Sequence, residues 1–74
     1  MALVRKLKRH NMDRNTVHGE ADCTYTIFTD SGKKYLQIDT YGSPHRQFVG
    51  KKSQSIQFDQ ESLEQLKDII RATL

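Results

Sequence analysis

The residues that most often carry catalytic or metal-binding chemistry are few in this chain, and their spacing matches no such pattern. The histidines are His10, His18 and His45, and Cys23 is the sole cysteine. Ligands of structural zinc sites come in close pairs, which these four residues do not form. No acid, Asp39 included, is followed two positions later by the lysine that is usual in metal-dependent nucleases. We therefore predict no catalytic residue, no metal and no cofactor, and a protein that is not an enzyme.

A different chemistry, contact with nucleic acid, is indicated by basic and aromatic residues that alternate through the middle of the chain. The basic residues are Lys33, Lys34, Arg46, Lys51 and Lys52, and the aromatic ones are Tyr25, Phe28, Tyr35, Tyr41 and Phe48. Lysine and arginine follow the charge of a single-stranded backbone, and each ring that stacks on a base contributes roughly 1 to 3 kcal/mol. The alternative is that these rings pack in the core or against neighbouring strands, which is their commoner role.

The excess positive charge lies at the start of the chain. Residues 1–14 hold five basic residues and one acid, a net charge of +4, whereas residues 15–74 hold seven basic residues and eight acids, a net charge of −1. Turn-forming polar residues soon interrupt the few apolar ones, so we predict a flexible basic arm over residues 1–15. Its candidate phosphate contacts are Arg5, Lys6, Lys8 and Arg9. The alternative is a solubilising tail, because basic arms serve both purposes.

The elements that must position these residues begin with a hairpin. Residues 23–28 and 33–41 alternate and are rich in β-branched and aromatic types, which favours two strands. The four residues between them, 29–32, are turn formers that end in a glycine. Leu36, Ile38 and Thr40 share one side of the second strand, which we expect to face the core.

A second hairpin and a helix follow. Pro44 breaks the pattern, after which residues 46–49 and 54–58 are expected to form the third and fourth strands. Asp59 is a typical helix N-cap, and the following apolar residues recur at helical spacing. They are Leu63, Leu66, Ile70 and Leu74. The fold class predicted is α+β: four antiparallel strands in two hairpins, then one C-terminal helix, as a single domain over residues 16–74.

The length of 74 residues limits what such a domain can do. A chain this short buries only about 60% of the surface that its unfolded form exposes, and the single cysteine allows no internal disulfide. We therefore expect a homodimer, and a binding module in place of an enzyme with a buried cleft. The charged opening segment has no apolar stretch typical of a signal peptide or membrane span, so we expect a cytoplasmic protein without membrane contact.

Several segments resemble a known family. Residues 28–33, 36–41, 50–52 and 56–67 are similar, in their order and residue types, to the transcriptional coactivator family called positive cofactor four, which has small bacterial relatives. The resemblance covers residues 23–70. It implies a curved antiparallel sheet followed by a helix, a homodimer, and binding of single-stranded DNA or RNA. It places Lys33, Lys51 and Lys52 at backbone contacts.

Three positions depart from the family's pattern. Asp39 stands where the family tends to have a basic residue, Gly42 follows Tyr41 in place of an exposed aromatic, and residues 53–55 lengthen the link into the last strand. The leading hypothesis is a small module for single-stranded nucleic acid in transcription or DNA maintenance. The alternative is an accessory subunit that docks on a larger protein without touching nucleic acid.

Overall fold

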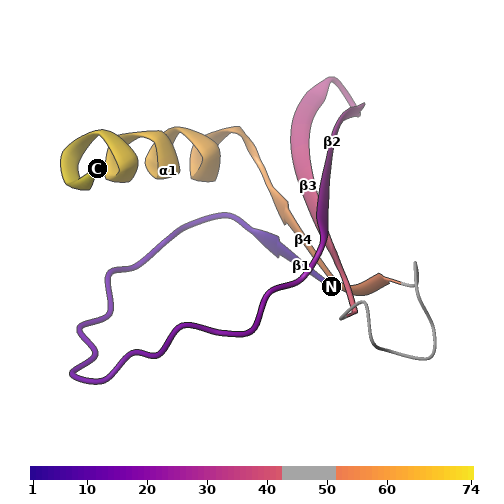
Figure 1. Ribbon diagram of the computed structural model, residues 1–74. Helices are drawn as coiled ribbons and strands as arrows, with labels where there is room; N and C mark the ends of the chain where they lie inside the picture. The colour runs from indigo at the N-terminus through magenta and orange to yellow at the C-terminus, as the bar shows by residue number, and fades with distance from the viewer. Residues whose placement is uncertain (43–51) are drawn as a thin grey trace.

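The computed structural model describes residues 1–42 and 52–74 (Figure 1). These residues form a single sheet followed by one helix. The elements are β1 (Ala2–Val4), β2 (Cys23–Asp30), β3 (Lys33–Tyr41), β4 (Lys52–Phe58) and α1 (Gln60–Thr73). In the sheet the strands lie in the order β1-β4-β3-β2. Strand β1 runs parallel to β4, whereas the β4–β3 and β3–β2 pairs are antiparallel.

The predicted first hairpin is confirmed. Asp30 pairs with Lys33 across a loop of two residues, Ser31 and Gly32. Both loop residues have positive φ, 50° for Ser31 and 78° for Gly32. This combination belongs to the type I′ turn, whose twist matches that of the flanking strands. The glycine therefore sets the register that brings Lys33 to the hairpin end.

The sheet is mixed, so the prediction of a purely antiparallel sheet made of two hairpins was wrong. The strand that makes the sheet mixed is β1, whose residues fall within the predicted basic arm. Three residues are too few to show strand periodicity, and β1 pairs with β4, more than fifty residues later in the chain. The sheet is also not strongly curved (Figure 1). The third predicted strand, residues 46–49, lies outside the described residues.

The helix begins where Asp59 predicts it. The Asp59 carboxylate accepts a hydrogen bond from the backbone N–H of Ser62 at 2.9 Å, the geometry of an N-cap. Glu61 in the first turn and Arg71 in the last suit the helix dipole. In the described part of the chain no helix is long and apolar enough to cross a membrane.

Strand register gathers the apolar residues on one face of the sheet. Tyr25, Ile38 and Ile56 lie in one row across the strands, and Ile27, Leu36 and Phe58 lie in the next. We call the side formed by these two rows the apolar face. Its β4 end meets the start of α1, and among the described hydrophobic residues only Phe58 is buried, at 8% exposure.

The helix does not lie along this face. Figure 1 shows α1 leaving the sheet, so that most of its length extends beyond the strands. Leu63 and Leu66 are half-buried, whereas Ile70 and Leu74 are exposed. The apolar stripe of the helix is therefore covered only over its first turns, because α1 continues in the direction in which the chain leaves β4.

Candidate nucleic-acid interface

The start of the chain is attached to α1 by hydrogen bonds. The Ser62 hydroxyl, which has no exposure to solvent, donates to the backbone carbonyl of Val4 at 2.7 Å. One turn later, the side-chain amide of Gln65 donates to the Leu7 carbonyl at 2.6 Å and accepts from the Leu7 N–H at 2.8 Å. Residues 4–7 therefore follow the first turns of the helix, and Arg5 is held between the two attachment points.

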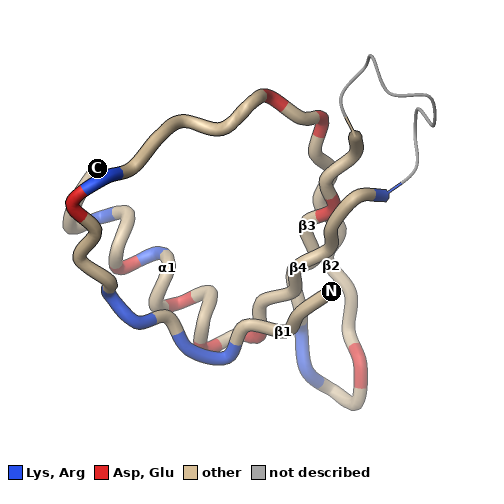
Figure 2. The backbone as a smooth tube through the Cα atoms, turned by 90° about the horizontal axis from the view of Figure 1, so that it is seen from below, with Lys and Arg blue, Asp and Glu red and all other residues tan. Residues whose placement is uncertain are grey.

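This attachment brings Arg5 to the end of the β2–β3 hairpin. A hollow of about 320 Å³ lies between β1, the hairpin and the start of α1, and we call it the hairpin hollow. Its charged and aromatic lining residues are Arg5, Lys33, Lys34, Tyr35, Asp59 and Glu61. Figure 2 shows the basic stretch that follows β1 and the basic end of the hairpin on either side of this strand. Three of the predicted basic contacts, Arg5, Lys33 and Lys34, thus lie at one place, although Arg5 is far from the other two in the sequence.

The charges of the hairpin hollow are only partly balanced. The Ser62 amide lowers the pKa of Asp59 below its ordinary value, and the charges of Arg5 and Lys33 lower it further, so this carboxylate is ionised at neutral pH. Asp59 already caps α1. Among the described residues, Arg5, Lys33 and Lys34 take part in no ion pair. Three cations and two carboxylates line the hairpin hollow, a net charge of +1, and the Asp30 carboxylate, which is not part of this lining, belongs to the residue opposite Lys33 in the hairpin.

Two aromatic rings stack beside the hairpin hollow. Phe28 and Tyr35 are paired across β2 and β3, with ring centroids 5.4 Å apart and planes 19° from parallel. Each ring covers one face of the other, so only the outer face of each ring can stack on a base. Tyr25 is 73% exposed but lies on the apolar face, on the other side of the sheet from Tyr35. The aromatic residues are therefore divided between the two faces.

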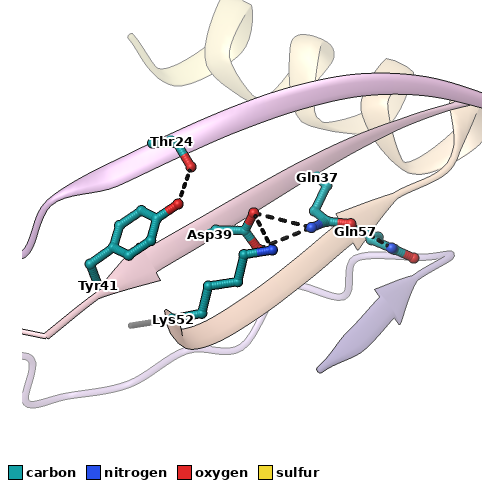
Figure 3. A network of polar contacts seen from close by, with 6 residues as sticks. All are labelled: Thr24, Gln37, Asp39, Tyr41, Lys52 and Gln57. Atoms are coloured by element: carbon teal, nitrogen blue, oxygen red, sulfur yellow. Dashed lines mark hydrogen bonds and ion pairs between the residues drawn. The ribbon is translucent and has the colours of Figure 1, made fainter. Parts of the chain in front are cut away.

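Lys52 has a partner within the sheet. Its Nζ lies 3.4 Å from Oδ2 of Asp39, whose side chain is only 4% exposed (Figure 3). The Gln37 amide nitrogen donates to both carboxylate oxygens at 3.0 and 3.1 Å, and the Gln57 amide donates to Gln37 at 2.8 Å. The hydroxyl of Ser55 and the amide of Gln37 lower the pKa of Asp39 below its usual value, and Lys52 adds to this effect.

The network changes the interpretation of two residues. Asp39 is not a bare carboxylate that repels phosphate, because Lys52 and two hydrogen-bond donors compensate its charge. Lys52 is correspondingly less available as a phosphate contact than its sequence position predicts. Gln37 and Gln57 were not predicted as part of a site, although their alternation with Ile38 and Ile56 along the strands was a signal that they share a face.

The remaining predicted contacts are dispersed or lie outside the described residues. Lys6, Lys8 and Arg9 are exposed on the segment after β1, where the Arg9 guanidinium donates to the Asn11 side chain at 3.3 Å. Arg46 and Lys51 fall in residues 43–51, which the structure does not describe. The proposed arm boundary at residue 15 stays a prediction.

Within residues 1–42 and 52–74, no three His, Cys, Asp or Glu side chains gather closely enough to hold a metal ion. In comparisons with protein-family models, curated proteins and solved structures, the chain matched none of them.

Proposed function

We propose that this chain is a small, non-enzymatic module that binds single-stranded nucleic acid at the hairpin hollow. The observation that supports it best is the convergence of Arg5, Lys33 and Lys34, three cations without an ion-pair partner among the described residues, beside the Tyr35 ring. Cations that are not paired with a carboxylate can replace the counterions condensed on a phosphate backbone. An aromatic face at the same place suits a neighbouring base.

The binding mode follows from the arrangement of the elements. Phosphates contact the three cations of the hairpin hollow, and a base stacks on the outer face of the Phe28–Tyr35 pair. Backbone charge and stacking do not depend on base identity, so we expect little sequence preference. Three phosphate contacts on a single strand predict a slope of log K against log salt of about −2.

Fluorescence anisotropy with labelled oligothymidine and oligouridine tests the proposal. The triple variant Arg5→Ala, Lys33→Ala and Lys34→Ala is expected to weaken binding to both oligonucleotides and to flatten the salt slope towards zero. A control removes two exposed cations from the helix, as Lys67→Ala and Arg71→Ala, of which Lys67 is paired with Glu64, and is expected to change binding little. If the two sets of substitutions weaken binding equally, the contact is diffuse and the hairpin hollow is not the site.

A second function, docking on a larger protein, is favoured by one observation. Tyr25 and Ile27 on the apolar face are 73% and 64% exposed, although residues of these types are usually covered. Two results together would establish this function in place of the first. The chain would bind no oligonucleotide at low salt, and it would recover one stoichiometric protein partner whose binding resists nuclease and is lost in Ile27→Glu.

A further inference from the structure

The sheet ends in two edges of opposite character. One edge is β1, which has three residues and is followed by the basic stretch of residues 5–9. The other is β2, which has eight residues, and no strand in the described part of the chain pairs with its outer side (Figure 1). Sheet edges are usually protected from pairing by short length, lysine, proline or a bulge. Strand β2 has none of these, since its register with β3 is unbroken from Cys23 to Asp30.

The backbone groups of β2 that point away from β3 follow from the hairpin. The residues that close a two-residue turn, here Asp30 and Lys33, form a hydrogen-bonded pair, and every second residue of the strand repeats this pattern. The hydrogen bond of 2.9 Å from the Tyr41 N–H to the Asp22 carbonyl fits it, because Asp22 is an even number of residues from Asp30. The N–H and C=O groups that point outward are therefore those of the odd-numbered residues, Cys23, Tyr25, Ile27 and Thr29.

The charge at this edge indicates the kind of partner. Residues 15–32 contain three acids, Glu20, Asp22 and Asp30, and neither lysine nor arginine. Asp22 directly precedes β2 and Asp30 is its last residue, so that acidic positions lie at both ends of the strand (Figure 2). Such an edge repels a nucleic-acid backbone and attracts an extended peptide with a cation at each end.

A second copy of this chain does not suit the same edge. Two β2 strands related by a two-fold axis run antiparallel, and full overlap centred on Thr26 brings Asp22 of each copy opposite Asp30 of the other. Like charges that lie directly opposite each other destabilise a strand pair. The edge therefore favours a strand of opposite charge from a different protein.

We infer that an extended segment of another protein, with apolar residues at alternate positions and lysine or arginine at both ends, adds to the sheet as a strand antiparallel to β2. Its backbone bonds to the outward groups of β2, and its apolar residues lie beside Tyr25 and Ile27, which are 73% and 64% exposed. Its cations lie opposite Asp22 and Asp30. The inference goes beyond the function proposed above and is independent of nucleic-acid binding, because none of these residues lines the hairpin hollow.

A synthetic nonapeptide serves as the probe, with lysine at each end, valine at its fourth and sixth positions and threonine elsewhere. With its lysines opposite Asp22 and Asp30, its valines lie opposite Ile27 and Tyr25. Hydrogen exchange of the full chain, followed by NMR at millimolar peptide, is expected to slow at the outward amides of Tyr25 and Ile27 and to stay unchanged at Thr26. No slowing overturns the inference. Slowing that appears without peptide as the protein concentration rises shows that a second copy occupies the edge, and overturns it as well.

N-methylation of the probe distinguishes strand addition from loose association. Methyl groups on the two valine nitrogens remove the N–H groups that face β2 and are expected to abolish binding. Methyl groups on the threonines that precede the valines remove N–H groups that point away from β2 and are expected to leave binding in place. Equal effects of the two modifications, or the reverse order, overturn the inference.

Charge reversal tests the chemistry of the partner. Asp22→Lys with Asp30→Lys is expected to weaken binding of the lysine probe about tenfold and to strengthen binding of an otherwise identical probe with glutamate at both ends. The matched control Asp13→Lys with Asp68→Lys makes the same change of charge at exposed positions outside β2 and is expected to keep the preference for the lysine probe. If both pairs of substitutions shift the preference equally, net charge and not this edge selects the peptide, which overturns the inference. The N-methylated probes need only the unaltered chain, so they cover the case in which the charge-reversed chain fails to fold.

Discussion

The Ser62 hydroxyl is a sensitive point of the fold, because it joins the helix to β1 and thereby positions Arg5. Ser62→Ala removes the 2.7 Å hydrogen bond to the Val4 carbonyl and the contact of 2.9 Å with the Asp59 carboxylate. The Val4 carbonyl then keeps only the longer hydrogen bond from the Asp59 N–H, at 3.5 Å. An intramolecular hydrogen bond contributes about 0.5 to 1.5 kcal/mol, and the higher helix propensity of alanine returns less than about 1 kcal/mol of this. We therefore expect a net loss of up to about 1 kcal/mol in the free energy of unfolding.

Urea denaturation measures the stability loss, and hydrogen exchange at the amides of residues 3–7 shows whether β1 is released. Thr73→Ala is the matched control, because its hydroxyl bonds to the Ile69 carbonyl at the exposed end of the same helix. Release of β1 also removes Arg5 from the hairpin hollow, so oligonucleotide affinity is expected to fall with it. The link between this hydrogen bond and the site is refuted by either of two results. One is a free energy of unfolding for Ser62→Ala equal to that of the Thr73→Ala control, and the other is release of β1 with no change in oligonucleotide affinity.

Three further predictions concern other parts of the structure. Gln65→Ala removes both hydrogen bonds to the Leu7 backbone and is expected to raise the rate of hydrogen exchange at the Leu7 amide while β1 stays paired. Faster exchange at the Val4 amide as well would show that the attachments of Leu7 and of β1 to the helix are not independent. Gly32→Ala places a side chain at φ 78° and is expected to cost about 1 kcal/mol in urea denaturation, and an unchanged midpoint would contradict the type I′ turn. Asp39 has a folded pKa below its ordinary value of 3.8, so its contribution to stability is present above about pH 4 and is lost as the pH falls through the folded pKa. The urea midpoint of Asp39→Asn should therefore depend less on pH in this range than that of the wild type, and equal dependence would contradict the network.

Local patterns in the sequence were sufficient for the hairpin and the helix. The turn residues before Lys33 and the N-cap at Asp59 act on their immediate neighbours, and both elements lie where these signals predict them. Strand β1 was missed because its three residues carry no periodicity, and its hydrogen-bond partners are in β4. The same separation hid the pairing of Asp39 with Lys52, which depends on the register between β3 and β4.

For the candidate site, the sequence by itself determined which residues carry positive charge and which of them flank the hairpin. It placed Lys33, Lys34 and Tyr35 at one hairpin end, because turn chemistry acts over a few residues. Only the tertiary structure decided that Arg5 joins them and that Lys52 is paired with Asp39. Both outcomes depend on which strands lie side by side, and strand pairing is set by contacts between residues distant in the chain that no local pattern encodes.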